Sequence, residues 1–402
     1  MPNPGAPSVK SSTVIAFAAG FAGLMPMATD IYLIVMPSIA RDFGASLAAT
    51  HASMAAFALG FGLAQLFVGV LADRHGRRPV AIAGALAFLL ATLAVLASTS
   101  LALLTASRFV QGFVIAACPV LSRAIVRDVV PAERAARTYA LVNATASLSP
   151  LTAPFLAAAA LGWGSWRIAM GVLLVYGAIL AVAVLTRMPE TLPPNLAQTK
   201  PLSPLAAARE ILTNTRFLCG ASLTVLLYSA LFTWISTSPF LMMDQLGFST
   251  TDAAIVLGLG SLGYMGGSLS TARLAGRYAP ERLIAVGAPL MLAGALGALF
   301  ALTRAHPGPI STLLLVLPFY LGLGFTHANA LQIVMRPFPH MAGQASAWLG
   351  VLQQLGGVIV SVLAVRAGAG VAAICVMIAC CAALLLVSAL LPRLLAEPRA
   401  AR

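Results

Sequence analysis

The chain has 402 residues, of which 60% are hydrophobic and only 9% are charged, and its formal net charge is +13. A soluble globular domain carries about 25% charged residues, so this composition excludes a soluble protein and predicts one that crosses a membrane several times. The basic residues form neither a basic domain nor an aromatic-rich basic stretch, which argues against nucleic-acid binding.

Twelve apolar runs follow one another along the chain. Each has roughly the 20 residues that a helix needs to cross a hydrocarbon core of about 30 Å. The predicted helices cover 13–37, 47–71, 79–99, 101–122, 136–160, 166–186, 217–242, 253–274, 282–303, 309–334, 343–365 and 369–391. The sequence therefore predicts an all-α membrane protein in which the first helix closes at Pro37.

The distribution of Lys and Arg predicts how these helices are oriented. With the amino terminus inside, 19 of the 24 lie in cytoplasmic segments, and Arg108 lies within a helix. The remaining four are outside: Arg41, Arg167, Arg304 and Arg366. Because cytoplasmic loops carry the basic excess, we expect a multi-pass protein of the cell inner membrane with both termini cytoplasmic.

The first predicted helix contains an acid, Asp30, within the run Met27–Leu33. An ionisable residue inside a transmembrane run costs on the order of 3 kcal/mol to insert and marks a functional site by default. In a transporter such an acid would alternate between its protonated and ionised forms. A structural acid that only holds a cation in the bundle is the alternative interpretation.

A loop rich in charge follows the second helix. Residues 69–79 hold five ionisable side chains between two apolar runs, and they read Gly69-x-Leu71-Ala72-Asp73-Arg74-x-Gly76-Arg77-Arg78-Pro79. This run resembles the loop signature of the major facilitator superfamily. The resemblance implies that fold: two six-helix halves related by pseudo-twofold symmetry.

The fourth helix carries Arg108, the only cation predicted inside the membrane. With a rise of about 1.5 Å per residue, Asp30 lies roughly 24 Å from the inner end of its helix and Arg108 roughly 10 Å from the outer end. The two charges therefore have a similar depth, and an ion pair or a shared water cavity between them is feasible.

A polar segment and an internal repeat divide the chain into two halves. Residues 188–210 contain five Pro and both signs of charge, and at an offset of 200 Gly76-Arg77 maps onto Gly276-Arg277. The predicted divisions are a disordered tail 1–12, a six-helix bundle 13–187, a cytoplasmic linker 188–210, a second bundle 211–392 and a cytoplasmic tail 393–402. Parallel repeats of six helices place the substrate at their interface.

Further motifs resemble a narrower branch, the Bcr/CflA drug:proton antiporters. They are Asp30-x-Tyr32-Leu33 with Pro37, Gln65-Leu66, Arg108-Phe109-x-Gln111, Arg123-Ala124-Ile125-Val126-Arg127-Asp128, Pro189-Glu190-Thr191, Ser238-Pro239-Phe240 and Ala342-Gly343-x-Ala345-Ser346-Ala347-x-x-Gly350-x-x-Gln353. The chain departs from the branch at Ile34, Val70 and Ala157-Ala158. The resemblance implies multidrug efflux in exchange for protons, with antibiotic resistance as its consequence.

Three groups of residues are the candidate sites. The proton-coupling pair is Asp30 and Arg108. The resemblance implies that Asp30 is the one coupling acid, because Ala22 stands where some related exporters carry a second acid. The expected cytoplasmic gate comprises Asp73, Arg74, Arg77, Arg127, Asp128 and Gly343. Polarizable Met, aromatic and amide side chains suit mixed ligands, and the expected substrate-binding residues are Met27, Tyr32, Phe57, Phe61, Gln111, Phe113, Tyr228, Phe232 and Trp348.

Other function classes lack their motifs. Neither Lys10 nor Lys200 lies in a phosphate-binding loop, which excludes ATP as a direct fuel. No His-Glu-x-x-His occurs and no His is placed to serve Ser222, so we expect no enzyme, no metal and no cofactor, with the proton gradient as energy source. The expected partners are drug-like molecules, protons and lipid around a monomer. A proton-coupled or facilitative transporter of a small metabolite remains the alternative.

Overall fold

A computed structural model of the chain describes residues 11–130, 138, 141–142, 145–146, 148–192, 204–275, 277–303, 307–338, 342–368 and 370–395. Apart from one isolated bridge between Ala275 and Tyr278, their regular structure is helical. The described residues include eleven spans long and apolar enough to cross a membrane, and the shorter apolar helix α7 makes twelve. This confirms the predicted all-α membrane fold.

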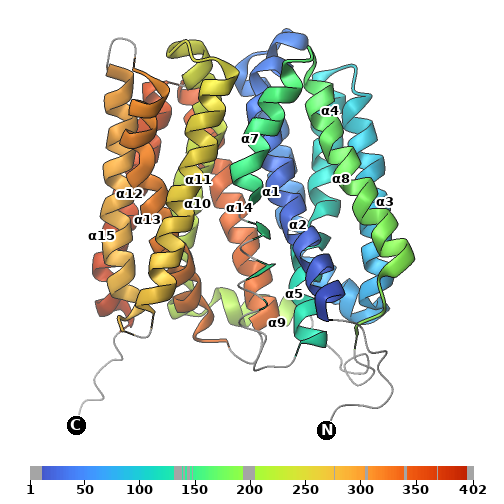
Figure 1. Cartoon of the computed structure of the whole chain (residues 1–402). Helices are drawn as coiled ribbons and strands as arrows, with labels where there is room; N and C mark the ends of the chain where they lie inside the picture. The colour runs from blue at the N-terminus through green and yellow to red at the C-terminus, as the bar shows by residue number, and fades with distance from the viewer. Residues whose placement is uncertain are drawn as a thin grey trace, which may run out of the picture.

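The helices form two bundles that lie side by side (Figure 1). The first contains α1 (Ser11–Asp42), α2 (Leu47–His75), α3 (Arg77–Leu96), α4 (Leu101–Ile115), α5 (Ala117–Val129), α7 (Leu148–Leu161) and α8 (Trp166–Arg187). The second contains α9 (Pro204–Leu212), α10 (Thr215–Phe240), the π-helix η2 (Leu241–Gln245), α11 (Thr250–Leu274), α12 (Pro280–Thr303), α13 (Pro309–Met335), α14 (Ala342–Ala367) and α15 (Val371–Leu395). Helices α1, α2 and α7 face α10, α14 and α11 across the interface of the halves.

We call the end of the bundle that holds residues 69–79 the signature end, and the end that holds the α1–α2 turn the opposite end. Serine residues cap helices that begin at the opposite end. The hydroxyl of Ser100 accepts a hydrogen bond from the backbone of Leu103, and Ser249 forms a capping box with Asp252 at the start of α11. These caps satisfy backbone N–H groups that have no partner within the helix.

Two predicted helix ends were wrong. Helix α1 does not close at Pro37 but continues to Asp42, because neighbouring helices in a bundle tolerate an internal proline. The fourth span does not end at 122 but reaches Val129, and it is interrupted at Ala116. Pro119 accounts for the interruption, since its ring clashes with the carbonyl four residues earlier. The predicted start of the fifth helix, both tails and most of the linker lie outside the described residues, and the expected boundary at 210 falls within α9.

Paired glycines bring α2 and α4 into backbone contact. A Cβ atom on Gly60 would overlap the carbonyl oxygen of Phe109, and one on Gly112 would overlap that of Phe57. Only glycine allows so close an approach. This contact fixes α4, and with it Arg108, against α2.

The second half repeats the contact between the equivalent helices. In α11 and α13, Gly267 would meet the carbonyl of Leu321 and Gly324 that of Tyr264. The register differs, because Gly60 lies 15 residues before the end of α2 and Gly267 only seven before the end of α11. The halves therefore share their architecture but not the depth of their closest helix contact.

Candidate functional site

Arg108 is completely buried in the first half, between two aromatic rings. Its guanidinium carbon lies 4.1 Å from the centre of the Tyr32 ring and 4.0 Å from that of Phe57. Cation–π contacts of this kind are strengthened when the groups are removed from water. The Tyr32 hydroxyl in turn shares a hydrogen bond with the hydroxyl of Ser53 on α2.

A chain of hydrogen bonds orients the same guanidinium. Nη1 of Arg108 donates to Oε1 of Gln111 at 2.6 Å, and Nε2 of Gln111 donates to the Thr92 hydroxyl at 2.8 Å. The Thr92 hydroxyl donates to the backbone of Phe88 on α3. Nε of Arg108 has no partner and is buried. The cation is thus held by neutral groups, with one donor unsatisfied.

Of the two arrangements that the depths allow, the ion pair between Asp30 and Arg108 is absent from the interactions of the described residues. Equal depth in the membrane does not determine which way a side chain points around its helix axis. Residues two apart on an α-helix point about 200° apart, so when Tyr32 faces Arg108, Asp30 must face away from it.

Asp30 lies on α1, which packs against α10 and α11 of the second half. Its carboxylate is close enough to the Tyr320 hydroxyl on α13 to interact with it electrostatically, and that hydroxyl accepts a hydrogen bond of 2.9 Å from the indole of Trp234 on α10. Oδ2 of Asp30 is buried and has no hydrogen-bond partner. The carboxylate therefore lies at the interface of the halves with part of its hydrogen-bonding capacity unused.

The expected substrate-binding residues separate into groups. Tyr32, Phe57 and Gln111 surround Arg108. Phe61 and Phe232 are buried in the main apolar core, against which the half-buried Met27 and Tyr228 pack. Phe113 and Trp348 lie apart from these residues. Phe113 is 40% exposed, on the face of α4 turned away from Arg108 together with Val110, and Trp348 packs in a separate cluster with Ile211 of α9.

In the second half, His327 on α13 contacts two tyrosines from neighbouring helices. Nδ1 of His327 shares a hydrogen bond of 3.0 Å with the hydroxyl of Tyr264, and its ring stands edge-on to Tyr228. The Asn329 side chain donates to the backbone of Phe325 in its own helix. His327 therefore bonds between helices, whereas Asn329 bonds within its own helix, because an amide can reach the carbonyl one turn earlier.

Four of the predicted gate residues form one network at the signature end. Arg77 donates from Nε to Asp128 at 2.8 Å and from Nη1 to Asp73 at 2.6 Å, and both Arg77 and Asp128 have side chains only 1% exposed. Arg127 joins Asp128 at 3.2 Å and Asp73 at 3.9 Å. The network ties α2, α3 and α5 together. Arg74 is exposed in the last turn of α2, and Gly343 lies in the first turn of α14 on the other half.

Glu190 is a member of this region that the site prediction missed. Its carboxylate accepts hydrogen bonds from the backbone N–H groups of Arg77 at 2.8 Å and Arg78 at 3.1 Å, at the start of α3. It also accepts from Thr191 and Leu192. Burial alone would raise the pKa of Glu190, but these four donors hold it below its ordinary value. Two signals were available: Glu190 belongs to the motif Pro189-Glu190-Thr191, and Gly76, the residue before α3, has no side chain with which to cap the helix.

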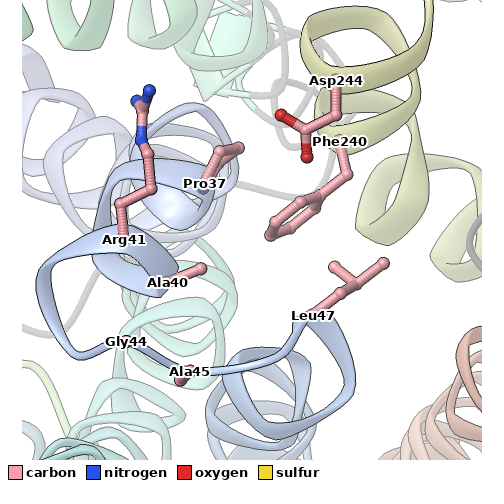
Figure 2. A pocket seen from close by; sticks show the side chains of 8 residues that line it. All are labelled: Pro37, Ala40, Arg41, Gly44, Ala45, Leu47, Phe240 and Asp244. Carbon is pink, nitrogen blue, oxygen red and sulfur yellow. The ribbon is translucent and has the colours of Figure 1, made fainter.

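The opposite end carries a cavity of about 330 Å³ between the halves. Figure 2 shows Arg41 at the end of α1 on one wall and Asp244 of η2 on the other, with Pro37, Leu47 and Phe240 forming apolar parts of the lining. The cavity thus lies between the halves at the end remote from the signature network.

Comparison with known proteins identifies the family. The profile of the Major Facilitator Superfamily matches residues 18–361. The chain is 33% identical to Multidrug resistance protein MdtL of Salmonella typhi over 336 residues, 83% of each chain. It resembles the structure of a D-xylose-proton symporter (TM-score 0.78, 16% identity, 97% of this chain and 99% of that one) and that of the nucleoside transporter NupG (TM-score 0.76, 11% identity, 95% and 100%). The chain belongs to the Major Facilitator Superfamily and is a membrane transporter of small molecules, not an enzyme.

Proposed function

We propose that this transporter exports small amphipathic drugs across the cell inner membrane in exchange for protons, with its signature end and both termini in the cytoplasm. The observation that carries the proposal is the Asp30 carboxylate, which lies at the interface of the halves with a buried, unpartnered oxygen. Similarity to a protein named for multidrug resistance supports drugs as the substrate class. The basic excess at the signature end supports the orientation.

Asp30 serves as the proton carrier in this proposal. A carboxyl that faces the second half changes its surroundings whenever the two bundles, 13–187 and 211–392, move relative to each other. An ionised carboxylate favours the arrangement that exposes it to water, whereas the protonated form tolerates burial. Proton binding and release then become linked to which end of the interface is open.

Arg108 contributes a fixed positive charge to the same bundle. Since neutral groups hold it and no carboxylate of the described residues pairs with it, its charge remains uncompensated within the membrane. Such a charge repels cations, and Asp30 faces away from it. This favours neutral amphipathic substrates, amphenicol-like compounds for instance, over quaternary cations.

The signature network acts as the cytoplasmic gate. Because Arg77, Asp73 and Asp128 join three helices of the first half, and Glu190 joins α3 to the segment after α8, the signature end of this half moves as a unit. Gly343 at the start of α14 presents the facing half. The dipole at that helix start favours an approaching carboxylate such as Asp73 when the gate is closed.

Expression in an efflux-deficient bacterial host tests the proposal. Resistance is scored side by side for neutral amphipathic compounds and quaternary cations, with Asp30→Asn as the inactive control. We expect resistance to neutral compounds that is lost in the variant. Resistance to quaternary cations alone would refute the substrate class, and uptake of a metabolite without any drug resistance would support the facilitator or symporter instead.

A further inference from the structure

The cavity at the opposite end is bounded by the first membrane-spanning helix of each half, α1 and α10. On α1 the lining residues Pro37, Ala40 and Arg41 share one helix face, since they are three and four residues apart. On the second half the lining residues are Phe240, at the end of α10, and Asp244, in η2. A cation on one half and an anion on the other therefore flank the same opening (Figure 2).

These two charges occupy related positions in the repeat. Helices α1 and α10 are the first membrane-spanning helices of their respective halves, and each has a proline near the opposite end, Pro37 and Pro239. Arg41 follows its proline by four residues and Asp244 by five. The π-helical turn of η2 accommodates one additional residue. Asp244 is thereby brought to the place that corresponds to Arg41.

Pseudo-twofold symmetry gives this correspondence a consequence. In a twofold arrangement, equivalent surfaces that face the axis also face each other. Arg41 and Asp244 both line the cavity at the interface, so an approach of the two halves at this end shortens the distance between them. Because their charges are opposite, such an approach is favoured.

The neighbouring acids Asp42 and Asp252 already have hydrogen-bond partners within their own halves. Asp42 accepts hydrogen bonds from Arg167 at 2.9 Å and from the indole of Trp166 at 2.8 Å, both within the first half. Asp252 caps α11 through Ser249. Arg41 and Asp244 are exposed, and neither belongs to an ion pair of the described residues. They are therefore available to each other.

We propose that Arg41 and Asp244 form the ion pair that closes the outer end of the transporter when its cytoplasmic end opens. The inference rests on the proposed alternating transport and adds the gate on the side remote from the signature network. In the state described here the pair is separated and the cavity lies between its members. The apolar lining by Leu47 and Phe240 would exclude water from the closed gate.

Charge reversal and exchange test the pair through transport. Arg41→Asp and Asp244→Arg each place like charges across the opening, and we expect each to lower drug efflux about fivefold in the efflux-deficient host. The double variant restores an opposite pair and should recover at least half of the wild-type rate. Arg366→Asp, a reversal at the same end outside the cavity, is the matched control and should stay within about twofold of wild type. A double variant no better than the single ones would overturn the proposal.

A distance measurement separates failure of the gate from failure of the proposed function. Spin labels are attached at Ala45→Cys and Gln245→Cys after replacement of the five native cysteines, and the purified protein is measured by pulsed electron paramagnetic resonance. We expect Arg41→Asp to shift the distribution toward long distances and the exchanged pair to restore the short ones. If the distance distribution is the same in the wild type, the single variants and the exchanged pair, the gate is refuted even where efflux is intact. If it responds while no drug is exported, the gate stands and the substrate class is wrong.

Discussion

The two halves of the molecule have equivalent helices but hold their charges in different ways at the signature end. In the first half Arg77 and Asp128 are 1% exposed and bonded at 2.8 Å within a larger network. In the second half the ion pair of Arg336 with Glu281 has a similar distance, 2.7 Å, but its side chains are 49% and 21% exposed. The comparison indicates that a buried ion pair ties helices of the first half together, whereas Arg336 and Glu281 join theirs nearer the surface.

The largest predicted effect comes from breaking each ion pair in turn. Removing one partner of a buried pair costs about 3–5 kcal/mol because the other charge stays buried, whereas an exposed pair is worth about 0–1 kcal/mol. Arg77→Ala should therefore destabilise the protein far more than Arg336→Ala. Chemical unfolding in mild detergent measures both. Equal losses of unfolding free energy in the two variants would contradict the difference between the halves.

A smaller effect is predicted at the glycine contact that positions Arg108. Gly60→Ala forces apart the backbones of α2 and α4, at a cost of about 1–3 kcal/mol. Gly69 lies in the same helix with no atom within 4 Å of its added Cβ, so Gly69→Ala is the matched control. It should be neutral or stabilise by about 0.5–1 kcal/mol. Thermal unfolding of the two variants gives the comparison. Equal destabilisation by both would contradict the special role of the contact at Gly60.

The smallest effect concerns Glu190, the cap of α3. Glu190→Gln leaves one acceptor oxygen in place of two, and loss of a helix cap costs about 0.5–2 kcal/mol. The pKa of Glu190 is lowered in the folded protein, so its stabilisation is present above the ordinary pKa and is lost as pH falls through the folded-state value. Unfolding measured against pH should show this dependence in the wild type and lose it in the variant. Identical pH profiles would contradict the role of the carboxylate.

Hydropathy predicted which segments cross the membrane. It did not predict how each helix is rotated about its axis or where a helix is interrupted. The third helix was expected at 79–99 and spans Arg77–Leu96, since run length and terminal charge fix a helix to within a few residues. The interruption at Ala116 was missed, although Pro119 was visible, because a proline can bend a helix without ending it.

The sequence predicted many of the residues of the site but few of the contacts between them. The network of Asp73, Arg77, Arg127 and Asp128 is formed by residues that the signature and its resemblance had already marked. The position of Asp30 near Tyr320 could not be predicted, because depth along a helix leaves its rotation open. Glu190 lies 113 residues from the backbone that it caps, a separation at which sequence patterns carry no contact information.

The proton-carrier role of Asp30 is the central claim, and one measurement tests it directly. Purified protein in proteoliposomes is given drug under an imposed pH gradient, and proton movement is followed together with drug movement. Asp30→Asn keeps the shape of the side chain but cannot exchange a proton. The account predicts that the folded, inserted variant shows no proton movement in response to drug, whereas wild-type coupling in Asp30→Asn would contradict it.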